Sequence, residues 1–424
     1  MRADTLPGQP PGGAARILVL ATAHSYRLEA FQSAADRLGV EVVRGLDAPP
    51  AFSGTGEAFL RLDFRDPARA ARQVLRYARA RPLQAIIPTD DVTVTLAARL
   101  AADLGLPHNS PDAAEATRDK HLMRQALARA GLRGPWFHLF STTVNPAMAA
   151  AQVSYPCVIK PTCLAGSRGV IRADDAAQFD VAFQRVQRLL ATLGSTEVLV
   201  EEYIPGREFA LEGLMRAGDL TVLALFDKPD PLEGPFFEET IYVTPSREPP
   251  AIQAAVEGCV AESAGALGLR EGAIHAEVRV NAAGAWLVEV ASRSIGGLCA
   301  QTLRFAHGAD VSLEELILRQ ALGRPLEGLE REQAAGGVMM LPIPGPGTLV
   351  GWQGEDAARA VPAIESIEIT ARLNYPLVPL PEGDSYLGFI FARATTPAKV
   401  EAALRAAYFC LHFEIEAPLS VLAG

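Results

Sequence analysis

The sequence predicts an α/β unit with a parallel sheet at the start of the chain, followed by α+β structure with antiparallel strands. Near the start, an apolar strand pattern at 16–21, helical spacing at 26–38 and a second strand pattern at 40–43 alternate in the order typical of parallel sheets. From residue 155 onward, short strand patterns instead follow one another with turns between them. The chain is therefore expected to begin with one α/β domain and to continue as mixed structure.

Two further segments complete the N-terminal unit. Residues 84–88 form an apolar strand pattern, and residues 92–104 have helical spacing that stops at Gly105. Together with the first three elements they predict a small Rossmann-like unit. No G-x-G-x-x-G motif follows the first strand, so nothing there indicates a dinucleotide site. Residues 345–351 come closest to that motif, but their spacing differs, and we interpret them as a turn.

Length and composition exclude several classes of protein. A chain of 424 residues with 49% hydrophobic residues is too long for a single core, so more than one domain is expected. No apolar run approaches the roughly 18 residues of a membrane span, and a net charge of -10 argues against general nucleic-acid binding. The five cysteines lack the close spacing of zinc or redox motifs, which predicts reduced thiols and a cytoplasmic protein.

The densest charge lies between Ile274 and Arg293, where residues alternate as in a β-hairpin. The first strand is expected to have an apolar face of Ala276, Val278 and Val280 and a charged face of His275, Glu277 and Arg279. On the second strand, one side is expected to carry Leu287, Glu289 and Ala291.

The turn of this hairpin decides whether its two acids meet. With a five-residue turn at 280–284, Glu289 lies opposite His275 and diagonal to Glu277, so that both carboxylates reach one hard cation. The alternative is a solvated face on which Glu and Arg form cross-strand pairs, which is the commoner case for an arbitrary hairpin. Other features of the chain favour the cation site.

A lysine near the end of the strand pattern at 156–161 precedes a loop of small residues. Lys160 followed by Gly166, Ser167 and Gly169 suits phosphate, because a glycine loop can turn backbone amides toward an anion. It is not a Walker loop, since G-x-x-x-x-G-K-[ST] is absent. Taken alone, such a loop is more often a hairpin turn.

The strand pattern at 197–204 runs into a Pro-Gly turn with an acid beyond it. A strand edge can offer backbone groups to an adenine ring, and a carboxylate such as Glu208 can bind ribose hydroxyls. By itself, a surface acid cluster is the simpler account. Upstream, Lys120 begins a helix at a position where single lysines are usually solvent-exposed.

In their order, these features resemble the ATP-grasp superfamily of carboxylate–amine ligases. The motifs are Asp-Lys-x-x-x-Arg at Lys120, Val-Ile-Lys-Pro at Lys160, the small-residue loop, Glu-Glu-Tyr-Ile-x-Gly-x-Glu from Glu201, and His-x-Glu followed by Glu-x-x-x-Arg between His275 and Arg293. Five elements in this order are far more specific than any one of them. The resemblance spans roughly residues 83–322, and the N-terminal unit matches the domain that usually precedes an ATP-grasp module.

The resemblance implies a division of the chain. The expected segments are a disordered leader at 1–14, a Rossmann-like domain at 15–115, an ATP-grasp nucleotide and metal domain at 116–335 with a lid subdomain at about 150–205, and a small α+β C-terminal domain at 336–424. The implied cofactors are ATP and Mg²⁺, with Mn²⁺ as a substitute metal.

The resemblance also implies roles for single residues. The expected ATP ligands are Lys120 and Lys160 at the phosphates, Gly166, Ser167 and Gly169 in the lid, Glu201, Glu202 and Ile204 at the adenine and Glu208 at the ribose. The expected metal ligands are Glu277 and Glu289. Arg293 would contact the transferred phosphoryl group or the acyl phosphate and, with Lys160, carry the catalysis.

One position departs from most ATP-grasp enzymes. Two residues after the second acid they have a metal-binding asparagine, whereas this chain has Ala291. Either one metal has fewer protein ligands, or Ser292 or water takes the place of the asparagine. The same replacement is familiar in bacterial L-amino acid ligases, which join two amino acids into a dipeptide, and residues 338–413 resemble their extra domain.

The expected substrate contacts are Glu239, His275, Gly296 and Gly297. Glu239 is the candidate partner of a substrate ammonium group. His275 positions substrate or orients a metal ligand, with a hydrogen-bonded structural histidine as the alternative. The two glycines leave room for an acceptor side chain or form a tight cap.

The sequence thus predicts an ATP-dependent ligase that joins an amino acid, or a similar small carboxylate, to an amine, typically a second amino acid, through an acyl phosphate. Two alternatives stand beside it: another ATP-grasp carboxylate–amine ligase with non-amino-acid substrates, and a non-catalytic nucleotide-binding module. No nucleic-acid or membrane partner is expected, and the resemblance is compatible with a homodimer.

Overall fold

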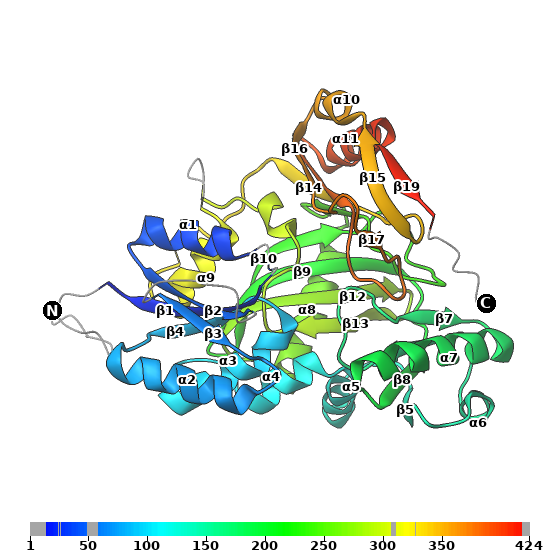
Figure 1. Cartoon of the computed structure of the whole chain (residues 1–424), viewed down its shortest axis with the longest axis horizontal. Helices are drawn as coiled ribbons and strands as arrows, with labels where there is room; N and C mark the ends of the chain where they lie inside the picture. The colour runs from blue at the N-terminus through cyan, green and yellow to red at the C-terminus, as the bar shows by residue number, and fades with distance from the viewer. Residues whose placement is uncertain are drawn as a thin grey trace.

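The computed structural model describes residues 14–23, 25, 27–48, 58–306, 311–326 and 328–417. The leader expected at 1–14 falls outside these residues except for its last position. An N-terminal unit, a large central sheet, a small lid sheet and a C-terminal unit make up the molecule (Figure 1). Among the described helices, none is both long and apolar enough to cross a membrane.

The N-terminal unit is a parallel sheet with helices around it. Its strands, in the order β3-β2-β1-β4, are β1 (Arg16–Thr22), β2 (Glu41–Asp47), β3 (Phe59–Leu62) and β4 (Ala85–Pro88), and its helices are α1 (Leu28–Leu38), α2 (Pro67–Ala80) and α3 (Asp91–Leu104). The Rossmann-like prediction is confirmed, although the sequence analysis did not identify β3 or α2. Gly39 and Gly105 end α1 and α3 in the left-handed conformation that glycine adopts most easily.

The lid is an antiparallel sheet in the order β5-β8-β6-β7. It consists of β5 (Phe137–Ser141), β6 (Cys157–Pro161), β7 (Ile171–Ala173) and β8 (Glu197–Glu202), with helices α6 (Pro146–Ala150) and α7 (Ala176–Leu193). Phe179 and Phe183 of α7 are fully buried in the lid core. The lid sheet begins before the predicted boundary at about 150, because β5 pairs with β8 along its whole length.

Eight antiparallel strands form the central sheet, in the order β13-β12-β9-β10-β11-β14-β18-β16. They are β9 (Arg207–Arg216), β10 (Asp219–Asp227), β11 (Ile241–Thr244), β12 (Gly272–Asn281), β13 (Gly284–Ala291), β14 (Ala335–Leu341), β16 (Ile364–Ile369) and β18 (Gly388–Ala394). The other elements of this region are α4 (Pro111–Arg118), α5 (Lys120–Arg129), α8 (Pro250–Leu267), α9 (Leu313–Ala321) and the 3-10 turn η1 (Cys299–Thr302).

The C-terminal segment shares the central sheet. β14 pairs with β11 from Ile241↔Met339 to Thr244↔Gly336, so the boundary predicted at 335/336 falls at the start of a strand. The otherwise free edge of β11 is completed by the strand that follows that boundary, so the C-terminal segment contributes strands to the central sheet as well as its own elements. A separate sheet of three further strands does belong to this segment alone.

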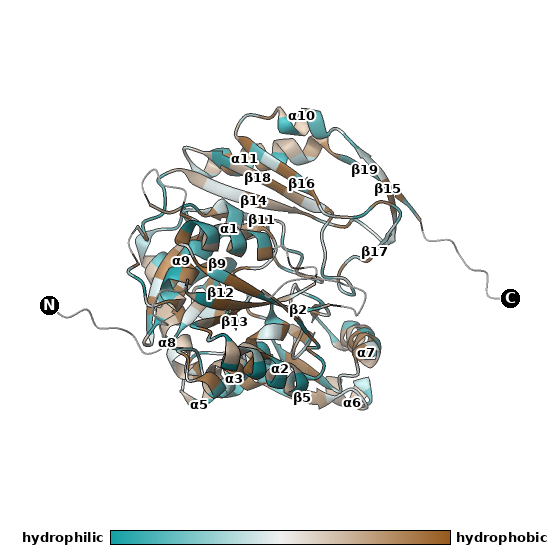
Figure 2. Ribbon diagram, turned by 60° about the vertical axis from the view of Figure 1, so that its left-hand side comes forward, coloured by the Kyte–Doolittle hydropathy of each residue, from teal (hydrophilic) through white to brown (hydrophobic). Residues whose placement is uncertain are grey.

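The remaining elements are β15 (Gly347–Gln353), α10 (Glu355–Arg359), β17 (Pro376–Leu377), α11 (Pro397–Cys410) and β19 (His412–Glu416). The glycine-rich stretch 345–351, interpreted as a turn, enters β15 at Gly347. Figure 2 shows α10, α11 and their strands on one side of the molecule and the lid helix α7 on another.

The charged hairpin has a different register from the predicted one. Its turn is short, with Asn281 paired to Gly284, and Glu277 lies directly opposite Glu289, while His275 lies opposite Ala291. With two residues in the turn and no bulge, Glu289 would lie on the opposite face of the sheet from Glu277. A bulge at Val288, between the pairs Val278↔Leu287 and Glu277↔Glu289, restores it to the face of the first.

The same bulge corrects a second expectation about β13. Leu287 does not share a side with Glu289 and Ala291, because it packs in the core with Val278 and Val290. The apolar face predicted for β12, with Ala276, Val278 and Val280, is confirmed.

Candidate functional site

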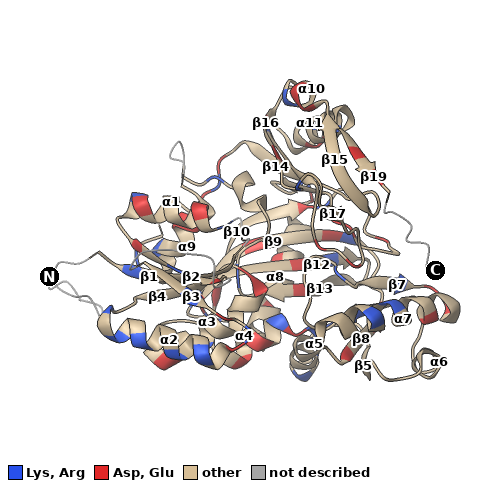
Figure 3. Ribbon diagram, viewed as in Figure 1, with Lys and Arg blue, Asp and Glu red and all other residues tan. Residues whose placement is uncertain are grey.

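A cavity of about 750 Å³ lies where the lid, the N-terminal unit and the central sheet meet. It collects all but one of the predicted site residues: Lys120, Lys160, Gly166, Ser167, Glu201, Glu202, Ile204, Glu208, Glu239, His275, Glu277, Glu289, Arg293, Gly296 and Gly297. The exception is Gly169, which packs against Pro161 and does not line the cavity. Figure 3 marks the acidic and basic positions along the ribbon, including those on the central strands and the lid helix α7.

A buried ion cluster forms the lid side of the cavity. Glu201 of β8 accepts hydrogen bonds from Lys160 Nζ at 2.5 Å and from Arg124 Nε and Nη2 at 2.8 and 3.1 Å. Burial opposes the ionised form of Glu201, but the two cations outweigh it and lower the pKa to about 2. Burial lowers the pKa of Lys160. Arg124 is the arginine of the Asp-Lys-x-x-x-Arg motif, so α5 and β6 supply both cations.

This cluster is expected to make the stability of the folded protein depend on pH in the acid range. The folded-state pKa of Glu201 is below its unfolded value, so the stabilisation is present above about pH 4.5 and is lost as the pH falls toward 2. A shift of this size corresponds to roughly 3 kcal/mol. We expect urea unfolding of the wild type to weaken more between pH 5 and 3 than unfolding of Glu201→Gln. Equal pH slopes would contradict the ionised, buried assignment.

Lys120 joins the lid to the charged hairpin. Its Nζ lies 3.0 Å from Glu289 Oε1 and donates to the Leu164 carbonyl oxygen at 2.6 Å. Burial lowers the pKa of Lys120, but Glu289 outweighs that effect and raises it. The lysine expected to be solvent-exposed when considered alone is in fact buried at the base of the loop.

A second buried ion cluster is centred on Lys228, which the sequence analysis did not single out. Three acids surround this lysine. Its Nζ lies 2.7 Å from Glu208 Oε1 and 3.1 Å from Glu277 Oε1, and also contacts Glu239. Oxygens of these three acids lie within 4.8 Å of one another, close enough to hold a metal ion. Lys228-Pro229 repeats the Lys-Pro sequence of Lys160-Pro161, which is the signal that could have identified it.

The pKa values of the acids in this cluster are shifted in different directions. Burial favours the neutral form of each, yet Lys228 outweighs it at Glu239 and lowers that pKa to about 2. At Glu277, burial and the neighbouring acids prevail over Lys228 and raise the pKa well above its usual value. A carboxyl group crowded by other carboxylates is a group whose charge a divalent cation would stabilise. The donor set therefore fits Mg²⁺, although Glu289 lies outside the three-acid group.

Arg293 is held by the N-terminal unit. Its Nε and Nη2 donate to the two carboxylate oxygens of Asp91, each at 2.7 Å, at the start of α3. Burial opposes both charges, but the pair outweighs it, so the pKa of Asp91 is lowered and that of Arg293 is raised. Sequence reasoning missed Asp91, although it follows the carboxyl end of β4, where ligands of parallel sheets bind.

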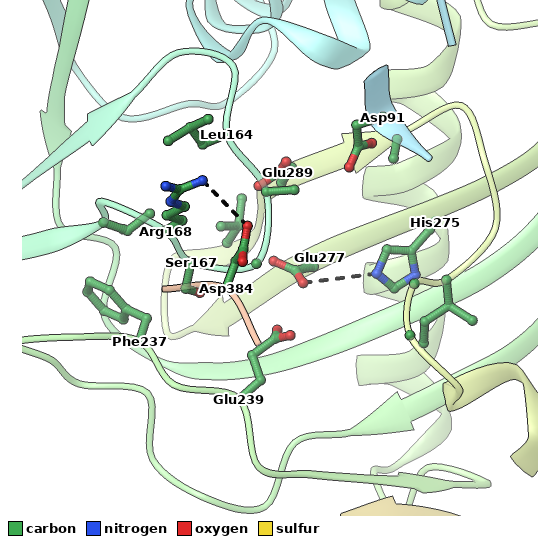
Figure 4. A pocket seen from close by; sticks show the side chains of 18 of the residues that line it. Asp91, Leu164, Ser167, Arg168, Phe237, Glu239, His275, Glu277, Glu289 and Asp384 are labelled. Atoms are coloured by element: carbon green, nitrogen blue, oxygen red, sulfur yellow. Dashed lines mark ion pairs between the residues drawn. The ribbon is translucent and has the colours of Figure 1, made fainter. Parts of the chain in front are cut away.

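His275 is fixed by a buried acid that the sequence analysis also missed. Its Nδ1 lies 3.1 Å from Glu212 Oε2, and its Nε2 lies 4.0 Å from Glu277 Oε1 (Figure 4). Glu212 also accepts hydrogen bonds from the Ile295 amide at 3.1 Å. Glu208 and Glu212 lie four positions apart on β9 and so share a face, which was the available signal.

The position of the usual asparagine offers no metal ligand here. Ala291 lines the cavity, whereas Ser292 faces away from it and its hydroxyl lies 3.0 Å from that of Thr117. The suggestion that Ser292 replaces the asparagine is therefore wrong, because consecutive residues of an extended chain point to opposite sides.

Part of the cavity lining is apolar or aromatic. This part includes Tyr242, Cys299, Met340, Tyr386 and Phe389. Gly297 has a φ of 58°, and a Cβ there would lie 3.3 Å from the ring of Phe389, whereas Gly296 is more open. The glycine pair thus leaves space beside an aromatic wall, and at Gly297 the backbone conformation also favours glycine.

The three segments of the chain each match a known family. Residues 31–108 match the ATP-grasp N-terminal domain, residues 153–302 the ATP-grasp domain, and residues 339–416 the L-amino acid ligase C-terminal domain 2. The alanine–anticapsin ligase of Bacillus subtilis is 27% identical over 284 residues, which cover 61% of this chain and 59% of that one. Carnosine synthase 1 of Gallus gallus is 30% identical over 294 residues, 64% of this chain and 31% of that protein.

A solved structure agrees over nearly the whole chain. The crystal structure of L-amino acid ligase from Bacillus licheniformis superposes with a TM-score of 0.78 and 25% identity, covering 95% of this chain and 99% of that one. Biotin carboxylase from Campylobacter jejuni, at 16% identity and a TM-score of 0.65, shares the fold.

The fold and the cavity define an ATP-grasp protein. With its L-amino acid ligase C-terminal domain and the agreement with the Bacillus licheniformis structure, the chain is an L-amino acid ligase-like member of that superfamily, as its motifs predicted. It spans about three fifths of the length of the alanine–anticapsin ligases that it matches.

Proposed function

We propose that this protein is an ATP-dependent carboxylate–amine ligase that acts on amino acids. A carboxylate oxygen of one amino acid, or of a similar small acid, attacks the γ-phosphorus of ATP, and ADP leaves. The amine of a second molecule, typically an amino acid, then attacks the acyl phosphate, and the amide forms as phosphate and a proton are released. The observation that carries the proposal is one cavity in which buried lysines, an arginine, and paired acids on a bulged hairpin converge.

The nucleotide is proposed to lie between the lid and the central sheet. Lys120 and Lys160 would bind its phosphates under Gly166 and Ser167, with Gly169 supporting the loop from outside the cavity. Glu201, Glu202 and Ile204 would border the adenine and Glu208 the ribose. Both lysines already have carboxylate partners within 3.0 Å, so the charge of the nucleotide would compete for them.

Glu277 and Glu289 are the proposed ligands of Mg²⁺, with Mn²⁺ as a substitute. The metal would neutralise charge on the transferred phosphoryl group. Because Ala291 offers no ligand and Ser292 is turned away, the protein supplies fewer ligands than in most members of the superfamily.

The remaining residues position the reactants. Arg293 would contact the phosphoryl group or the acyl phosphate, and His275, held by Glu212, would orient Glu277 or the substrate. Glu239 remains the candidate partner of a substrate ammonium group. That group would replace Lys228 as the cation beside the Glu239 carboxylate. Gly296 and Gly297 would admit the side chain of the acceptor.

The Asp91 contact gives a test of the role of Arg293. In Asp91→Asn, an amide replaces one of the two acceptor oxygens, so the guanidinium loses its fixed orientation. We expect kcat to fall about tenfold with little change in the KM for ATP. Steady-state ADP release would measure this, with Asp103→Asn, an exposed position on the same helix, as control. An unchanged kcat would show that this pair does not position the arginine.

The proposal itself is tested by a substrate screen. Amino acids are supplied singly and in pairs with ATP and Mg²⁺, ADP release is measured, and products are identified by mass. Activity on no pair would contradict amino-acid ligation and favour another ATP-grasp ligase with different substrates. A cytoplasmic location and a homodimer stay predictions.

A further inference from the structure

The loop at residues 378–387, between β17 and β18, reaches across to the lid. The Gly169 amide donates to the Pro381 carbonyl oxygen at 2.7 Å, and Arg168 Nε donates to the Glu382 carbonyl oxygen at 2.8 Å. Arg185 of α7 donates two hydrogen bonds to the Glu382 carboxylate, at 2.5 and 2.8 Å. The glycine loop and the lid helix therefore both bind one short segment of the C-terminal unit.

These contacts lie at the wall of the cavity. Ser167 and Arg168 of the lid and Asp384 of the 378–387 loop all line it, and Arg168 Nη1 lies 3.7 Å from Asp384 Oδ2 (Figure 4). A Cβ at Gly166 would lie only 3.5 Å from the Asp384 Cβ. The lid and the C-terminal unit thus meet over the cavity, and separating them would open it to water.

The chemistry of the contact suits reversible closure. The side chains of Arg185 and Glu382 are 36% and 39% exposed, so their pair is weak enough to break in each turnover. Ser167, with a φ of 55°, has a left-handed backbone conformation that is costly for a non-glycine residue, and such strain is found at ligand clamps and switch regions. On its other side the lid is attached to the loop before β11, where the Arg172 amide donates to the Pro235 carbonyl oxygen.

We propose that Glu382 is a positioning residue that holds the lid closed through Arg185 while the acyl phosphate exists. This inference rests on the proposed ligase function. If the lid opens early, water attacks the intermediate, and the products are the free carboxylate and phosphate in place of the amide. The C-terminal unit then serves to couple ATP consumption to amide formation.

Limited proteolysis tests the closure without any substrate. Trypsin can cut between Arg168 and Gly169, and the contacts described above protect that bond. We expect Glu382→Gln to be cut about fivefold faster than wild type in the presence of Mg²⁺ and ADP. Glu355→Gln is the matched control, because Glu355 and Arg359 form a pair of similar exposure on α10, away from the lid.

The outcomes of this experiment separate the two proposals. If Mg²⁺ and ADP protect neither protein relative to the unliganded state, nucleotide binding, and with it the ligase proposal, is contradicted. If they protect wild type and Glu382→Gln to the same extent, with equal cleavage rates, the role of Glu382 is overturned while the ligase proposal stands.

The second readout is the ratio of ADP to amide on a productive substrate pair. We expect this ratio to rise about threefold in Glu382→Gln and in Arg185→Met, with no further rise in the double variant, because both changes break the same ion pair. A general loss of stability would lower ADP and amide together and leave the ratio unchanged. An unchanged ratio in folded variants would therefore overturn the inference.

Discussion

Glu277→Gln is expected to lose ADP formation about 10³-fold while the protein stays folded. Its carboxylate is crowded by Glu208, Glu239 and Glu289, and burial together with these acids raises its pKa, so removal of the charge does not weaken the fold. The same carboxylate is the proposed magnesium ligand. ADP release and the thermal midpoint, measured on the same preparation, test both statements.

Glu257→Gln on the exposed face of α8 is the matched control, since it removes one acid that does not line the cavity. Glu289→Gln should lose activity similarly, although it also removes a partner of Lys120. Full ADP formation by a folded Glu277→Gln or Glu289→Gln protein would contradict the proposal that these acids are the metal ligands.

Lys228→Met is expected to lower the free energy of unfolding by about 3 to 5 kcal/mol near neutral pH. The lysine is buried against Glu208, Glu239 and Glu277, so its removal leaves three acids without their common cation. In the variant, burial and mutual repulsion raise the pKa values of Glu239 and Glu277 in the folded state, whereas Glu208 keeps its ion pair with Arg279. The folded protein then binds more protons than the unfolded chain.

The pH dependence of the stability of Lys228→Met follows from this difference in the number of bound protons. Its stability should rise as the pH falls from 8 toward 5, so its deficit relative to wild type becomes smaller. Added Mg²⁺ should also stabilise the variant more than wild type, because the three acids can serve as its ligands. Urea unfolding at several pH values measures both effects. A deficit that is independent of pH would contradict the electrostatic account.

Most of the site was predictable because its residues lie in local motifs. Lys160 is placed by a strand followed by proline, and Glu208 by the turn after β8, so short patterns were sufficient. The register of the hairpin was not predictable, since the bulge at Val288 leaves no mark in the alternation of residues. Only the pairing of β12 with both β9 and β13 fixes it.

The missed residues act across large distances in the sequence. Asp91 reaches Arg293 from another unit, and Glu382 reaches Arg185 from beyond the central sheet. No local pattern records such contacts, because an isolated acid in a loop has the same appearance whether or not it has a partner. The shared central sheet was missed for the same reason, since the edge completed by β14 is formed almost a hundred residues earlier.

The central claim is that a substrate carboxylate is phosphorylated in this cavity and then captured by an amine. The most direct measurement uses an amino acid labelled with ¹⁸O in its carboxylate, together with ATP, Mg²⁺ and the amine that the screen identifies. We predict that each amide formed is accompanied by one phosphate that carries a single ¹⁸O atom from the substrate. Unlabelled phosphate released alongside the amide would contradict an acyl phosphate intermediate.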